Sequence, residues 1–127
     1  MISEIVFDYQ KISNMMEYTY VQKMSIVKVL LDIISVDGKI DARETHFFEE
    51  IKIRLDLSAE DHFRVREYNT LNCLSVIKEM TVEQKNYYRE LMSGIILADG
   101  VIEENEQIAY DNICEFCGIP SDSLKVK

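Results

Sequence analysis

The chain has 127 residues, 47% hydrophobic and 29% charged, a composition typical of one soluble globular domain rather than a disordered chain. It contains only four glycines and one proline, so turns are few and helices are favoured over an all-β fold. The formal net charge is −9 and the basic residues are scattered, which argues against binding to nucleic acid or insertion into an anionic membrane.

Apolar residues recur at steps of three and four and predict helices from the first residues onward. We expect an N-terminal helix over residues 3–17, a buried helix over 19–35 whose apolar stripe starts at Val21, and a third helix over 41–55. A short helix follows, because Ser58 stands three residues before Asp61, the spacing of a capping box.

The second half of the chain continues the helical pattern. Residues 71–77 predict one helix, and residues 81–97 predict a long one that opens on a second capping box. The last helix is expected over 103–117, where Gly118 and then Pro120 stop it. No strand-like alternation of useful length is present, so the fold class is all-α.

An internal repeat organises these helices. A shift of 62 residues lays residues 21–57 onto residues 83–119 without a gap. We therefore expect a single domain, residues 1–127, in which two helix–turn–helix units are related by an approximate twofold axis. The identical pairs include Gln22 with Gln84, Ile33 with Ile95, Gly38 with Gly100, Ile40 with Ile102, Glu44 with Glu106, and Ile51 with Ile113.

The turn of each unit resembles half of a calcium loop: VDGKIDARE at 36–44 and ADGVIEENE at 98–106. With the glycine at position 6 of an EF-hand loop, the acids fall on positions 5, 9 and 12. Position 1, however, becomes Ile33 in one copy and Ile95 in the other. An isoleucine side chain offers no oxygen to a hard cation, so neither turn is an EF-hand.

A purely structural interpretation explains part of the repeated motif. The glycines allow a left-handed turn at the end of a helix, and Asp41 with Glu44 has the spacing of a cap for the next helix. Glu103, Glu104 and Glu106 would then form a solvated first helical turn. Asp37 and Asp99 are left over, because an acid is mildly unfavourable near a helix C-terminus. A functional interpretation therefore stays open beside the structural one.

The duplicated motif resembles the tellurite-resistance TerB-like domain. It is also similar to the N-terminal region of membrane-anchored DnaJ-like cochaperones. The resemblance rests on a long apolar helix ending in Asp-Gly, an Ile two residues later, an acid, and a Glu six residues after the Gly. Val36 departs from the usual Ala of this pattern, and the match covers about residues 19–119.

This resemblance implies a compact bundle of about seven helices and an association with tellurite and other chemical stress, phage defence and metal-sensing complexes. It also implies a metal-binding acidic surface, with a divalent cation, calcium or another, as the candidate ligand. Carried over position by position, the metal candidates are Asp37, Asp41, Glu44, Asp99, Glu103 and Glu106.

The remaining reactive side chains form no catalytic pattern. Cys114 and Cys117 make a CxxC at a helix C-terminus, where the dipole raises the thiol pKa, so we interpret them with Cys73 as buried structural thiols. His46 and His62 stand in no catalytic spacing. A deep pocket that held either histidine beside acids would favour an enzymatic alternative.

From the sequence we predict a non-enzymatic, cytoplasmic, TerB-like adaptor that binds a divalent cation and another protein. Three cysteines without a signal peptide fit a reducing compartment. The alternative is a metal-independent protein-interaction domain that uses an exposed apolar groove.

Overall fold

The computed structural model describes residues 17–36, 42–98 and 100–120, and within these ranges it contains helices and no strand. The all-α prediction is therefore confirmed, whereas the helix expected over 3–17 lies almost wholly outside the described residues. None of the helices found in these ranges is long and apolar enough to cross a membrane. The elements are α2 (Tyr20–Ser35), α3 (Ala42–Arg54), α4 (Ala59–Arg64), the 3-10 helix η1 (Val65–Glu67), α5 (Thr70–Lys78), α6 (Val82–Ile96) and α7 (Glu104–Cys117).

Local sequence signals set the ends of several helices. Both predicted capping boxes are present, at Ser58 before α4 and at Thr81 before α6, and Thr19 forms a third before α2. Each hydroxyl accepts a hydrogen bond from the backbone N–H three residues on, satisfying a donor that the helix cannot pair itself. Gly118 ends α7 with φ of 71°, a left-handed conformation that favours glycine.

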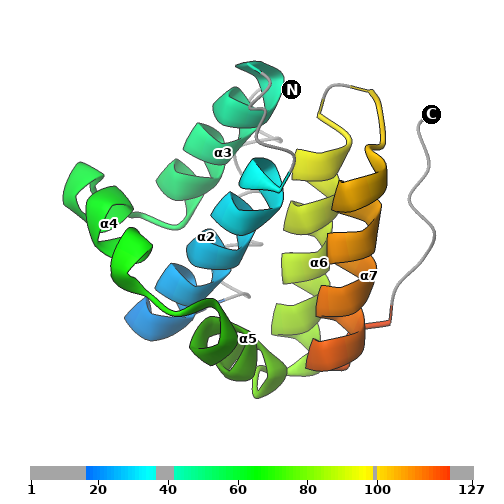
Figure 1. The fold of residues 1–127 in the computed structure, drawn as a ribbon. Helices are drawn as coiled ribbons and strands as arrows, with labels where there is room; N and C mark the ends of the chain where they lie inside the picture. The colour runs from blue at the N-terminus through cyan, green and yellow to red at the C-terminus, as the bar shows by residue number, and fades with distance from the viewer. Residues whose placement is uncertain (1–16, 37–41, 99, 121–127) are drawn as a thin grey trace, which may run out of the picture.

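Helix α2 lies at the centre of the bundle and packs against α3, α5, α6, α7 and η1 (Figure 1). The buried stripe was predicted to start at Val21, but this residue is 51% exposed at the start of the helix. Between Met24 and Ile34 every side chain is buried except three: Lys28, Leu31 and Asp32. Such a helix has only one open face.

The N-terminal ends of α2 and α6 are joined by hydrogen bonds. Gln84 Nε2 donates to the Glu17 carbonyl oxygen at 2.7 Å and to Gln22 Oε1 at 3.4 Å. Tyr18 Oη donates in turn to the Gln84 carbonyl oxygen at 2.9 Å. From this junction the two helices run in the same direction, so their C-terminal ends reach the same end of the bundle (Figure 1).

Aromatic residues of α3 and α6 contribute to the hydrophobic core. Phe48 and Tyr88 are buried, while Phe47 and Tyr87 lie partly exposed at the edge of the core. The Phe47 ring packs directly on Gly94 of α6, where a Cβ atom would collide with it. Glycine at this position therefore permits the close approach of α3 to α6.

Candidate functional site

Three of the six predicted metal ligands lie in described segments. Glu44 and Glu106 occupy the first turns of α3 and α7 and are only 5% and 3% exposed, whereas Glu103 is exposed. The expectation of a solvated first turn is thus wrong for Glu106. Asp37, Asp41 and Asp99 lie outside the described residues.

The helices that precede the two acidic motifs, α2 and α6, have their C-terminal ends at the same end of the bundle (Figure 1). In the part of the chain that the structure describes, no group of three or more histidine, cysteine, aspartate or glutamate side chains is placed to hold a metal ion. The predicted cation site therefore depends on the aspartates outside that part.

The buried acids have the environment of structural groups. A carboxylate in the first turn of a helix is favoured by the helix dipole, but its burial is costly unless other groups engage it. Both Glu44 and Glu106 do have interaction partners. They stand at equivalent positions of the sequence repeat, so the same buried acid supports the entry to α3 and to α7.

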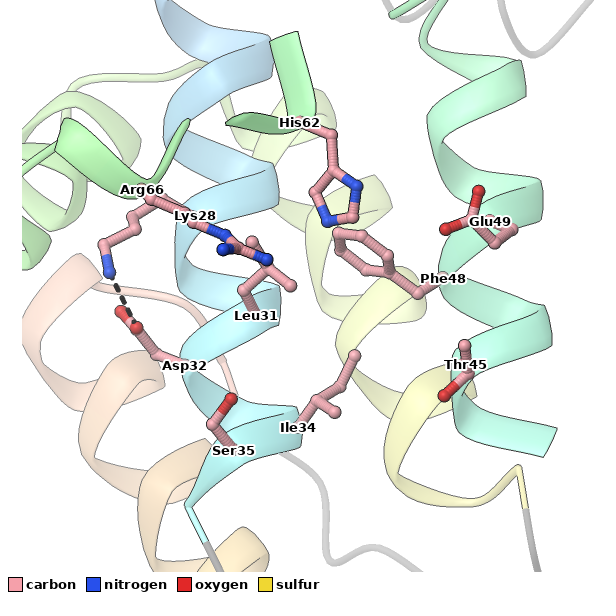
Figure 2. Close-up of a pocket in the computed structure, with 10 residues that line it drawn as sticks. All are labelled: Lys28, Leu31, Asp32, Ile34, Ser35, Thr45, Phe48, Glu49, His62 and Arg66. Atoms are coloured by element: carbon pink, nitrogen blue, oxygen red, sulfur yellow. Dashed lines mark hydrogen bonds and ion pairs between the residues drawn. The ribbon is translucent and has the colours of Figure 1, made fainter. Parts of the chain in front are cut away.

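A second feature is a cavity of about 390 Å³ on the open face of α2, which we call the side cavity (Figure 2). Its volume lies in the range of small-molecule sites, roughly 300–1,000 Å³. Its walls come from α2, α3 and the α4–η1 segment. The lining residues are Lys28, Leu31, Asp32, Ile34, Ser35, Thr45, Phe48, Glu49, His62 and Arg66.

The wall formed by α4 and η1 is set by local and long-range contacts. The Ser58 capping box starts α4, and Tyr20 Oη of α2 donates a 2.6 Å hydrogen bond to Asp61 Oδ1 within that box. His62 follows directly, and Arg66 comes four residues later. Residues four apart share a helix face, so both side chains enter the side cavity.

Two lysines in and beside the side cavity are paired with acids. Lys28 Nζ lies 3.0 Å from Asp32 Oδ1, and the other oxygen of Asp32 accepts a 2.7 Å hydrogen bond from Thr70. Lys52 Nζ lies 2.9 Å from Glu49 Oε2 and is only 11% exposed. The charges of these two pairs cancel.

Arg66 is the remaining cation. Its guanidinium contacts the ring of Phe63 at 5.9 Å but forms no ion pair with any described residue. In Figure 2 the guanidinium extends toward the middle of the side cavity, on the side that faces His62, while Lys28 turns away to Asp32. The side cavity thus carries one positive charge without a matching acid, in a chain whose net charge is −9.

The contacts of His62 favour the neutral imidazole with its proton on one particular nitrogen. Partial burial and the positive charge of Lys52 lower its pKa below the ordinary value of 6.5. Lys52 Nζ lies 3.1 Å from Nδ1, and an ammonium group can only donate. Nδ1 is therefore the acceptor, the proton resides on Nε2, and Nε2 points into the side cavity (Figure 2).

This orientation suits binding better than base catalysis. His62 does line a cavity beside two acids, the arrangement that would have favoured an enzyme. In catalytic triads, however, a carboxylate holds Nδ1–H and leaves Nε2 free to accept a proton. In this protein Lys52 donates to Nδ1, so the donor and acceptor nitrogens are exchanged relative to a triad, and Nε2–H is a hydrogen-bond donor.

The three cysteines are buried, as predicted. Burial raises the pKa of Cys114 and of Cys117 to about 11 and also raises that of Cys73. Thiols with such pKa values remain protonated at neutral pH and are poor nucleophiles. Their role in the core is packing.

The sequence of α2 carries a local trace of the side cavity. Polar or small residues interrupt the apolar stripe of α2 at helical spacing, and the repeat breaks at the same place. Lys28 is paired with Glu90 by the shift of 62 residues, and Asp32 is paired with Gly94. The second unit therefore has an acid in place of the lysine and no side chain in place of the aspartate, so it lacks the Lys28–Asp32 pair of the first unit.

These features define the chain as an all-helical bundle with a charged cavity on one side. No protein-family model and no curated protein matches it. Among solved structures, a protein of unknown function from Porphyromonas gingivalis W83 is similar, with a TM-score of 0.70 and 21% sequence identity. The match covers 84% of this chain and 91% of that protein. It shows a shared fold.

Replacing the buried Glu44 or Glu106 should lower the stability of the protein more than replacing the exposed Glu103. We expect Glu44→Ala and Glu106→Ala each to lower the free energy of unfolding by about 1–3 kcal/mol, because the groups that interact with each buried carboxylate lose their partner. Glu103→Ala should change it by no more than about 0.5 kcal/mol. Urea unfolding measures all three, and equal losses would refute a structural role for the buried pair.

The pKa of His62 should depend on Lys52. Replacing this lysine in Lys52→Met removes a nearby positive charge and the donor to Nδ1, so protonated imidazole becomes less unfavourable and the pKa rises. The pH titration of the His62 Cε1 proton by NMR measures it. Lys78→Met removes a distant exposed lysine and should leave the pKa unchanged; an unchanged or lower pKa in Lys52→Met would contradict the assignment.

Proposed function

We propose that the chain is a non-enzymatic TerB-like adaptor that takes up a divalent cation through its two acidic turns, at the end of the bundle that the C-terminal ends of α2 and α6 reach. The observation that carries this proposal is the parallel course of α2 and α6 from their joined N-terminal ends. Two turns at one end can present their carboxylates to a common ion, whereas turns at opposite ends could not.

The proposal includes the internal twofold relation between the pair α2–α3 and the pair α6–α7. In its favour, residues equated by the repeat are buried alike: Phe48 with Tyr110, and Glu44 with Glu106. The hydrogen bond between Gln22 and Gln84 joins equivalent residues, an arrangement compatible with an approximate twofold axis that passes between them.

The acids of the turns divide into two roles in this proposal. Glu44 and Glu106 support the helix entries from inside, and Asp37, Asp41, Asp99 and Glu103 are the outer ligands. Carboxylates held close together repel one another, and a hard cation with oxygen ligands relieves that repulsion. The cytoplasm and a protein partner in a stress response remain part of the proposal through the family resemblance.

A metal-independent protein-interaction domain is the second candidate. The observation in its favour is the exposure of large apolar side chains on α3 and α4, where Ile53 is 77% and Phe63 is 70% exposed. Exposed apolar groups of this size mark contact surfaces when they lie together. The side cavity is not the apolar groove expected for this candidate, because four charged residues, Lys28, Asp32, Glu49 and Arg66, stand among the ten that line it.

Isothermal titration calorimetry with Ca²⁺, Mg²⁺ and Zn²⁺ tests the cation proposal. The wild-type protein should give saturable heat with at least one ion, because its outer carboxylates replace part of the hydration shell. The variant Asp37→Asn/Asp99→Asn should lose that heat.

The matched control is Glu60→Gln/Glu115→Gln, which removes the same number of charges from exposed positions on α4 and α7. This control should bind as the wild type does. Absence of heat with every ion would defeat the cation proposal and leave the interaction domain.

A further inference from the structure

We propose that the side cavity binds a small organic molecule that carries one carboxylate group and an apolar tail. This site is separate from the acidic turns, and the inference does not depend on the cation proposal. It rests on the placement of Arg66 and His62 above an apolar floor.

The acid group of the ligand is specified by two donors. The Arg66 guanidinium and the Nε2–H of His62 both point into the side cavity (Figure 2). A planar guanidinium offers two parallel N–H groups that match the two oxygens of a carboxylate. Within the described part of the chain, neither donor group is committed to an acid, and Lys52 keeps the imidazole in the donor form.

The charge of the ligand follows from the charges around the cavity. Asp32 is paired with Lys28 and Glu49 with Lys52, so the excess is the single positive charge of Arg66. A monoanion compensates it. A dianion such as a phosphate monoester would bring a second negative charge close to Asp32 and Glu49, which line the same space.

The apolar residues that line the side cavity favour an apolar tail on the ligand. Leu31, Ile34 and Phe48 line the side cavity from α2 and α3, and the Phe48 ring lies beside His62 with 5.7 Å between ring centroids. A volume of about 390 Å³ has room for a short alkyl chain or one aromatic ring. Burial of that tail supplies the hydrophobic part of the affinity.

NMR titration of the ¹⁵N-labelled full chain with 3-phenylpropionate and with hexanoate tests this proposal. EDTA is present throughout, so that metal binding at the turns cannot contribute. We expect saturable shifts concentrated at the amides of residues that line the side cavity. Arg66→Gln should weaken binding at least about tenfold, the loss typical of one charged hydrogen-bonding group.

Two controls separate recognition of the carboxylate from general effects. Arg64→Gln makes the same charge change two residues away, at a side chain that does not line the side cavity, and should keep the affinity within about twofold. The neutral 3-phenylpropanamide should bind at least about tenfold more weakly than the acid. Thermal unfolding of Arg66→Gln should match the wild type because Arg66 is exposed.

Three results would overturn the proposal. The first is the absence of saturable shifts at the side cavity with both acids. The second is equal affinity for the acid and its amide, which would mean that the charge is not recognised. The third is an equal effect of Arg64→Gln and Arg66→Gln, which would reduce the role of Arg66 to long-range electrostatics.

Discussion

The near-complete burial of α2 is the constraint on which the other features depend. A helix buried on almost every side needs partners around it, and α3, α5, α6, α7 and η1 supply them. Each large apolar side chain buried in this way contributes roughly 1.5–3 kcal/mol. Within the buried stretch from Met24 to Ile34, the charged groups of α2 are consequently confined to one stripe, where Lys28 and Asp32 stand, and the side cavity forms over that stripe.

Contacts made by residues at the start of α2 help to position the elements around both candidate sites, the proposed cation site and the side cavity. At the start of α2, Gln22 contacts Gln84 of α6, and the two helices run in the same direction from this junction, so their C-terminal ends reach one end of the bundle. Tyr20 holds the first turn of α4 through Asp61, and so places the residue that follows, His62. One helix therefore connects the turns to the side cavity, although the two sites use different chemistry.

Features that depend on neighbouring residues could be predicted from the sequence. The capping box at Thr81 and the left-handed Gly118 are local patterns, and the structure confirms them. The burial of Glu106 could not be predicted, because charges in a first helical turn usually face solvent. The polar stripe of α2 marks one wall of the side cavity, but the sequence does not show which element forms the opposite wall. That wall requires the contact between Tyr20 and Asp61, which are 41 residues apart, and no local pattern encodes this contact.

We propose that the side cavity presents hydrogen-bond donors to an anion and that His62 does not act there as a catalytic base. The most direct measurement is the tautomer of His62, obtained from the ¹⁵N chemical shifts of its ring nitrogens at neutral pH. The account predicts an unprotonated Nδ1 and a protonated Nε2, because Lys52 donates to Nδ1. A protonated Nδ1 with a free Nε2 would contradict it and return His62 to the role of a base.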